Sequence, residues 1–212
     1  AEARDLVFGS VPADPEVNLK LLLATLHEAA ITGAAPELTT FFPNLGGTRH
    51  PDDPALRAAA LRQVSANREA LRERFRQRPH VVKTALRRAV MLKALVTDAW
   101  QALGRPARYA LVDLGCGMGL SLRLHQHRIA ITPDAFVLDV GGIFLPVERR
   151  GPGMPPFELP SPAKSIGVDL HPLDAGNAAD RAAVLSFLLP EDVADFDAMH
   201  RMMAMLAAEP PD

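Results

Sequence analysis

The sequence has one cysteine, almost no net charge and no long apolar run. A single cysteine, Cys116, excludes an intramolecular disulfide and is typical of a reducing compartment. The formal net charge of −2 excludes a global electrostatic attraction to nucleic acid or to anionic lipid. No apolar run reaches the roughly 18 residues of a bilayer span, and no basic segment followed by an apolar one opens the chain. We therefore expect a cytoplasmic protein without membrane or nucleic-acid partners.

Metal-binding patterns are also missing. The sequence contains no Cys-x-x-Cys and no His-Glu-x-x-His pattern. The nearest approach is His125-x-His127, which would need His171 or Asp169 as a further ligand, and a structural zinc site requires four ligands of fixed geometry. We predict no metal site.

The first half of the chain is expected to be helical. Its apolar residues recur at spacings of three and four, and a loop rich in glycine, proline, asparagine and aspartate interrupts the pattern. The predicted helices are Pro15–Gly33, 53–78 and 80–103. The apolar stripe expected on the second consists of Leu56, Ala60, Val64, Asn67, Leu71 and Phe75. One face of the second is rich in arginine, interspersed with Glu69 and Glu73; this pattern is typical of a solvated face, and phosphate binding is the alternative. We predict a helical N-terminal region, residues 1–104.

A glycine-rich segment follows the apolar run Tyr109-Ala110-Leu111-Val112. It reads Asp113-Leu114-Gly115-Cys116-Gly117-Met118-Gly119 and is expected to connect a buried strand to the start of a helix. Glycines at such a turn allow positive φ angles and close approach of a ligand, and a helix N-terminus offers unpaired N–H groups. The segment therefore indicates a cofactor loop, although tight turns of this kind also occur without a ligand.

The spacing acid-x-Gly-x-Gly-x-Gly resembles the first motif of class I S-adenosylmethionine-dependent methyltransferases. In the dinucleotide-binding fingerprint the third glycine comes one residue later. The resemblance implies S-adenosylmethionine as cofactor. Gly115, Gly117 and Gly119 would then admit its amino-acid and ribose parts, with Cys116 beside the ligand. Asp113 would hold the turn, or the cofactor's ammonium through a bridging group.

A second buried strand is predicted at Ser165-Ile166-Gly167-Val168-Asp169-Leu170. An acid at the tip of a second parallel strand can accept the ribose hydroxyl protons of a cofactor, so Asp169 is the predicted ribose ligand. The alternative is a turn acid before His171-Pro172, because turns favour aspartate. Between the two strands, residues 127–164 form three short predicted strands, which we interpret as a β-hairpin insertion. Its irregular tail, 151–162, is either a loop over the cofactor mouth or an exposed connection.

Two helices are expected after the second strand. Asn177 is suited to cap the first, and the second covers residues 191–208. The second helix carries Met199, Met202, Met203 and Met205. Methionines at this spacing usually fill a core; a soft-metal or partner-binding face is the alternative.

Several parts of the sequence together resemble a bacterial domain-of-unknown-function family. They are the run Tyr109–Leu122, the segment Gly167-Val168-Asp169-Leu170-His171-Pro172-Leu173-Asp174, and the later pairs Asp180-Arg181 and Leu189-Pro190. That family is regarded as having a methyltransferase-like fold. The resemblance implies an α/β protein with an incomplete Rossmann-like parallel sheet, interrupted by the β-hairpin insertion, in residues 105–212.

This chain departs from the family pattern at three places. Thr84-Ala85-Leu86-Arg87 stands where the family tends to have Thr-Asn-Glu-Val, and His125-Gln126-His127 replaces Asp-Arg-Tyr. Family members also continue beyond the point where this chain ends, so the carboxyl-terminal half of the fold is expected to be absent. Three alternatives stay open: another chain completes the sheet, the sequence is part of a longer protein, or the fold differs from the one that the resemblance implies.

Three functional hypotheses follow. The first is methyl transfer from S-adenosylmethionine to a small molecule, in which orientation of the reactants contributes most and no catalytic base is assigned among His125, His127 and His171. The second is a non-catalytic binding or assembly subunit, completed by a second copy or a partner chain. The third, carried only by the arginine-rich helix, is an RNA methyltransferase with salt-dependent RNA binding.

Overall fold

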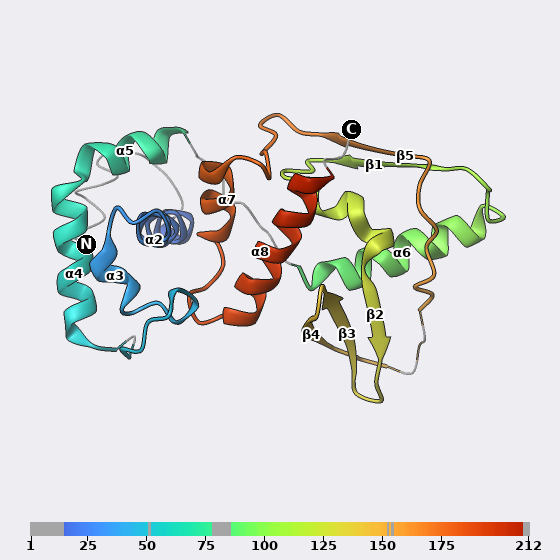
Figure 1. Ribbon diagram of the computed structural model, residues 1–212, viewed down its shortest axis with the longest axis horizontal. Coiled ribbons are helices and arrows are strands. Elements are labelled where there is room, and N and C mark those ends of the chain that lie inside the picture. The colour runs from blue at the N-terminus through green and yellow to red at the C-terminus, as the bar shows by residue number, and fades with distance from the viewer. Residues whose placement is uncertain (1–14, 51, 78–85, 152, 154, 210–212) are drawn as a thin grey trace. The chain divides into compact units, whose positions relative to one another are not determined.

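The computed structural model describes residues 15–50, 52–77, 86–151, 153 and 155–209 (Figure 1). The chain divides into two compact units, here called unit 1 and unit 2. Unit 1 comprises Ala1–Thr84 and Ala182–Phe196, and unit 2 comprises Ala85–Arg181 and Asp197–Asp212. The predicted domain boundary near residue 104 stays a prediction, because compactness alone does not show which parts fold independently.

Unit 1 contains the first helices of the chain. These are α2 (Pro15–Ile31), α3 (Pro36–Thr39), the 3₁₀ helix η1 (Pro43–Leu45), α4 (Pro54–Ala66) and α5 (Arg68–Gln77). The predicted stop after α2 is confirmed, since Gly33 has a φ of 76°. The core consists of small and aliphatic side chains with one aromatic: Leu26, Ala30, Ala35, Leu38, Phe41, Ala59, Val64 and Leu71.

The long helix predicted for residues 53–78 is two helices. The break falls at Asn67, whose φ of −116° and ψ of 24° lie outside the helical region. Its side-chain amide donates to the carbonyl oxygen and to the side-chain oxygen of Gln63, 3.3 Å and 2.9 Å away. An asparagine that bonds to the preceding turn in this way competes with continuation of the helix, so its place in the predicted apolar stripe was wrong.

Residues from both sequence segments of unit 1 meet at His27, which is 2% exposed. Its Nδ1 lies 3.2 Å from the carbonyl oxygen of Ser186, and the amide nitrogen of Asn44 lies 3.0 Å from its Nε2. The Asn44 amide can only donate, so Nε2 accepts and Nδ1 carries the proton toward Ser186. Burial lowers the pKa of His27 and keeps the ring neutral. A neutral histidine thus joins α2 to the second sequence segment of unit 1, Ala182–Phe196.

Unit 2 contains α6 (Arg88–Ala102) and a pair of parallel strands, β1 (Ala110–Leu114) and β5 (Lys164–Val168). Asp113 pairs with Gly167 and Leu114 with Val168. The 3₁₀ helix η2 (Leu120–Gln126) contacts both α6 and the two strands. The predicted helix 80–103 is confirmed from Arg88 onward; its first residues lie outside the described part of the chain.

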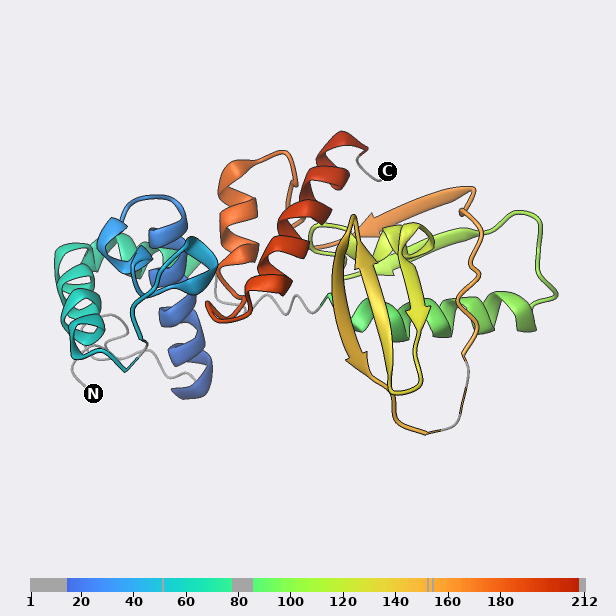
Figure 2. The same cartoon turned by 60° about the horizontal axis from the view of Figure 1, so that its bottom comes forward.

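The predicted β-hairpin insertion is confirmed as a three-stranded antiparallel sheet (Figure 2). Its strands are β2 (Arg128–Ile131), β3 (Ala135–Val140) and β4 (Ile143–Glu148), in the order β2-β3-β4. Leu138 of the central strand faces Leu145, and both are fully buried. Alternate residues of β3 and β4 therefore form one covered apolar face.

The last helices are α7 (Ala178–Leu185) and α8 (Val193–Ala208). Asn177 caps α7 as predicted: its side-chain oxygen accepts the N–H of Ala179 at 2.8 Å. Met199, Met202 and Met203 are at most 2% exposed, which confirms them as core residues. Met205 is 43% exposed and does not belong to that core.

Candidate functional site

The glycine-rich loop between β1 and η2 has the backbone that the sequence predicts. Gly115, Gly117 and Gly119 have φ angles of 77°, 55° and 81°. Residues with a Cβ adopt this left-handed region only with strain, so the turn requires glycine at all three positions. The N–H of Gly115 donates to the carbonyl oxygen of Val168 at 2.7 Å, which ties the loop to the end of β5.

The helix after this loop differs from the prediction. Instead of an α-helix, the chain forms the seven-residue 3₁₀ helix η2, which is interrupted at Arg123. The cause lies in the segment itself, because Gly119 enters it in the left-handed conformation. The row of free N–H groups at an α-helix N-terminus is therefore not part of this site, and a ligand would meet the backbone of the glycine loop instead.

Two predicted acids lie at the loop. The carboxylate of Asp169 accepts the N–H of Gly117 at 2.7 Å and the N–H of His171 at 2.8 Å. These two hydrogen bonds are the main reason why the pKa of Asp169 is lowered. Asp113 accepts the hydroxyl of Ser121, a residue that the sequence reasoning did not select. Asp169 thus acts as a turn acid and also joins the two loops; each carboxylate oxygen keeps a further lone pair for a ligand.

Cys116 lies between the first two glycines and points its sulfur toward β5. A Cβ built on Gly167 would lie 2.7 Å from the Cys116 sulfur, so these two residues are in close contact. Burial, followed by the negative charges of Asp169 and Asp113, raises the pKa of the thiol. A raised pKa keeps the thiol protonated and argues against a role for Cys116 as a nucleophile.

A cavity of about 210 Å³ opens beside the loop. Cys116 to Gly119 form one wall, and Pro172 to Ala175, from the segment after β5, form another. Both segments follow the carboxyl ends of parallel strands, the edge at which open α/β sheets bind ligands. The N–H of Leu173 donates to the carbonyl oxygen of Gly117 at 3.1 Å and holds the walls together. Asp174 lines the cavity, and among the described residues no lysine or arginine does.

The histidines considered as catalytic bases do not line this cavity. His127 is 5% exposed, and burial together with the charges of Lys93 and His125 lowers its pKa to about 4. The ammonium of Lys93 lies 2.5 Å from the carbonyl oxygen of His127 and caps the end of η2. Lys93 was missed by the sequence reasoning, because a lysine on an apolar helix usually points into solvent.

The irregular connection between β4 and β5 lies at the opposite end of β1. The N–H of Ala163 donates to the carbonyl oxygen of Tyr109 at 2.8 Å, and the hydroxyl of Tyr109 bonds to the carbonyl oxygen of Pro160. Tyr109 precedes the first residue of β1, whereas the glycine loop follows the last. Residues 155–163 are therefore a connection at that end of β1 and do not cover the glycine loop.

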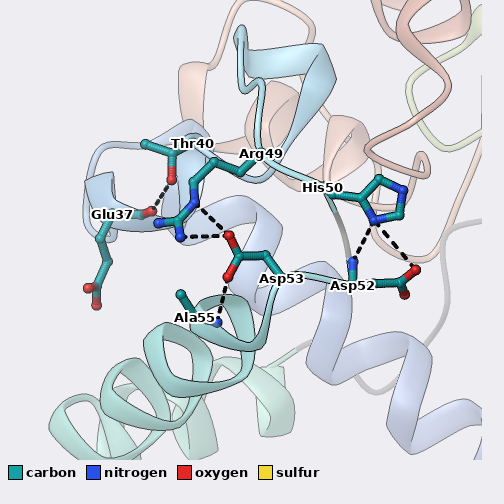
Figure 3. Close-up of polar contacts among 7 residues, drawn as sticks. All are labelled: Glu37, Thr40, Arg49, His50, Asp52, Asp53 and Ala55. Atoms are coloured by element: carbon teal, nitrogen blue, oxygen red, sulfur yellow. Dashed lines mark hydrogen bonds and ion pairs between the residues drawn. The ribbon is translucent and has the colours of Figure 1, made fainter.

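A second polar cluster lies before α4 in unit 1 (Figure 3). Arg49 bonds to the carboxylate of Asp53 at 2.9 Å and 2.6 Å, and the other oxygen of Asp53 accepts the N–H of Ala55 at 2.8 Å. The guanidinium also lies 4.6 Å from the centre of the Phe41 ring. Asp53 is the N-cap of α4, so this cluster fixes a loop and a helix start.

Within the described ranges, no group of three or more histidines, cysteines and acids is arranged to hold a metal ion. No helix in the same part of the chain has the length and apolar content of a membrane span.

The fold and the loop define a class: a mixed α/β protein with a glycine loop at the carboxyl edge of two parallel strands. The chain belongs to a family described as an uncharacterized protein conserved in bacteria (DUF2332), whose model matches residues 7–212. The resemblance to a bacterial domain-of-unknown-function family is thereby confirmed. Neither the curated proteins nor the solved structures contain a significant match to the chain.

Proposed function

We propose that this protein binds S-adenosylmethionine at the glycine loop and transfers its methyl group to a small molecule in the cytoplasm. The observation that carries the proposal is the left-handed backbone of Gly115, Gly117 and Gly119 beside the carboxylates of Asp113 and Asp169. Glycines in this conformation leave the backbone open to a ligand, and the acids face the ligand's hydroxyl and ammonium groups. On this reading β1 and β5 are the first two strands of a Rossmann-like sheet.

The charge of the cavity favours this cofactor over a dinucleotide. Asp174 lines the cavity, Asp169 lies at its loop, and no cationic side chain is among the lining residues. A pyrophosphate would be repelled by these acids, whereas the ammonium and sulfonium groups of S-adenosylmethionine would be attracted. The single free cysteine agrees with the reducing cytoplasm.

Each residue then has a limited role. The glycine loop would admit the amino-acid and ribose parts of the cofactor, and the free lone pairs of Asp169 would accept the ribose hydroxyls. The cavity of about 210 Å³ is smaller than a drug-sized ligand site of about 300–1,000 Å³, so these residues hold only part of the cofactor. Methyl transfer depends chiefly on orienting the two reactants, and no general base is assigned.

The test is calorimetric titration of the purified chain with S-adenosylhomocysteine. We expect saturable binding by the wild type and no binding of the dinucleotide NAD. Asp169→Ala should weaken binding about tenfold or more, because hydrogen bonds to a charged group contribute at least that much. Asp197→Asn, an exposed change on α8, should bind as the wild type does. A folded chain with no affinity for S-adenosylhomocysteine would contradict the proposal.

One observation favours a second candidate, an assembly subunit whose sheet is completed by another chain. The two-stranded sheet leaves Val112, Leu114 and Val168 exposed at 54%, 77% and 50%. Parallel sheets are normally covered on both faces and bounded by further strands. Light scattering on the same sample separates the candidates: self-association without affinity for S-adenosylhomocysteine favours the subunit, and a monomer that binds it favours the enzyme.

A further inference from the structure

Unit 2 contains a second cavity, at the amino end of β1. Its volume is about 400 Å³, which lies within the range of small-molecule sites, about 300–1,000 Å³. Trp100, Gln101 and Arg105 form one side, at the end of α6, and residues 158–160 form the other. The five residues of β1 separate this cavity from the glycine loop by about 13 Å, because a strand rises about 3.3 Å per residue. The two cavities are therefore distinct.

Arg105 has a backbone conformation that arginine rarely adopts. Its φ is 54°, and within the described ranges it is the only residue other than glycine with a positive φ. It also precedes Pro106, and a residue before proline is pushed toward extended conformations. The helix end needs only Gly104 in the left-handed region, where its N–H donates to the carbonyl oxygen of Gln101 at 3.0 Å. Strain that the helix end does not require is typical of residues held in place for a ligand.

Hydrogen bonds hold the backbone on both sides of the cavity, and the Trp100 ring as well. The N–H of Arg105 donates to the carbonyl oxygen of Trp100 at 3.0 Å, and the indole N–H of Trp100 donates to the carbonyl oxygen of Pro106 at 3.1 Å. On the other side, the hydroxyl of Tyr109 bonds to the carbonyl oxygen of Pro160, and Leu159 is 7% exposed. Positions held in this way before a ligand arrives reduce the entropy lost on binding.

The charges of the cavity are opposite and unpaired. Arg105 and Glu158 both line it and are exposed, and neither side chain forms a hydrogen bond or an ion pair within the part of the chain that the structure describes. A ligand with one charge of each sign would satisfy both: its carboxylate would pair with the guanidinium and its ammonium with Glu158. Trp100 and Leu159 line the same cavity and supply its apolar surface.

We propose that this cavity binds a small zwitterion, an α-amino acid with an apolar side chain. The carboxylate of the amino acid pairs with Arg105, its ammonium pairs with Glu158, and its side chain lies against Trp100. The cavity is independent of S-adenosylmethionine binding at the glycine loop, so either proposal can fail without the other.

The single tryptophan makes the test direct, because Trp100 alone reports on the indole environment. L-leucine, L-valine and L-phenylalanine are titrated while the emission excited at 295 nm is recorded, and calorimetry detects binding that leaves the emission unchanged. We expect saturable binding. Leucinamide, which lacks the carboxylate, and 4-methylpentanoate, which lacks the ammonium, should each bind about tenfold more weakly or less. Absence of binding by all three amino acids, or equal binding of leucine and its two analogues, would overturn the proposal.

Variants test the residues named. Arg105→Gly removes the guanidinium and also relieves the left-handed strain, so the melting temperature should stay the same or rise while leucine affinity falls at least about tenfold. Loss of binding in this variant cannot then be attributed to unfolding. Glu158→Gln should weaken leucine binding but leave binding of 4-methylpentanoate unchanged. Arg57→Ala, an exposed change on α4, is the control. Wild-type affinity in Arg105→Gly would also overturn the proposal.

Discussion

The two sheets of unit 2 differ in how much of each is covered. In the antiparallel sheet Leu138 and Leu145 are 0% exposed and Val140 is 2% exposed. In the parallel pair no residue is fully covered, and Leu114 is 77% exposed. The antiparallel strands are joined by short turns, whereas β1 and β5 pair across the whole intervening insertion. Local pairing and burial therefore coincide in one sheet, and both proposed ligand cavities adjoin the other.

This difference has a physical basis. On the function that we propose, the glycine loop opens to a ligand and is not covered by a closely packed core, since ligand-binding segments are drawn from the less stable parts of a fold. The glycine loop is held by hydrogen bonds from its backbone instead of by burial. One of them joins the N–H of Gly117 to the carboxylate of Asp169 at 2.7 Å. We expect core substitutions to affect stability mainly in the antiparallel sheet, and substitutions in the parallel pair to affect mainly the loop.

The largest expected effect is truncation of Leu138. Leu138→Ala should lower the free energy of unfolding by about 3 kcal/mol, because it removes a fully buried side chain and leaves a cavity. Its matched partner is Val112→Ala in β1, which removes a side chain that is 54% exposed and should cost less than about 1 kcal/mol. Urea denaturation of both variants measures the difference. Equal losses would show that the two sheets contribute alike.

The next effect is a loss of stability in acid that is caused by His127, the residue between η2 and β2. His127 stays neutral in the folded protein until about pH 4, whereas its ordinary pKa is 6.5. The stability that the neutral His127 ring contributes to the folded protein is fully present above pH 6.5. As the pH falls from 6.5 to about 4 the unfolded state gains a proton that the folded state does not, so up to about 3 kcal/mol is lost.

His127→Phe keeps a ring of similar size but cannot titrate, so its unfolding free energy should fall less steeply over that pH range. Denaturation at several pH values gives the two slopes. Their difference reports on His127, because His27 and His125, whose pKa values burial also lowers, are present in both proteins. His50→Phe, a change at an exposed loop position, is the control. A variant with the wild-type slope would show that His127 does not titrate in this way.

Much of this arrangement could be predicted because it depends on local rules. Glycines at 115, 117 and 119 predicted left-handed turns, and short apolar runs separated by turn residues predicted the antiparallel strands. Asn177 predicted a helix cap. In each case a residue type has a preference that its own few neighbours satisfy.

The rest depends on contacts that spacing does not reveal. Asn67 breaks a helix through its own side chain, although its place in the apolar period favoured continuation. Lys93 can be buried because its ammonium donates hydrogen bonds to the carbonyl oxygens of His125 and His127, which are distant in the sequence. Nothing in the local sequence marks Arg105 as left-handed, since arginine has no preference for that region. These residues became visible only when segments far apart in the chain were placed together.

After the losses at Leu138 and His127, the next smaller effect lies in the parallel pair and links it to the glycine loop. Gly167→Ala should lower the free energy of unfolding by about 2 kcal/mol, because the added methyl would lie 2.7 Å from the Cys116 sulfur. Cys116→Ala removes that sulfur, and its Cβ lies 3.4 Å away, an ordinary contact. The double variant should therefore be more stable than the sum of the single losses predicts, as urea denaturation of all four proteins would show. Additive losses would mean that the loop moves away from β5 without cost. Coupling would show instead that Cys116 packs against Gly167 and ties the loop that we propose binds the cofactor to β5.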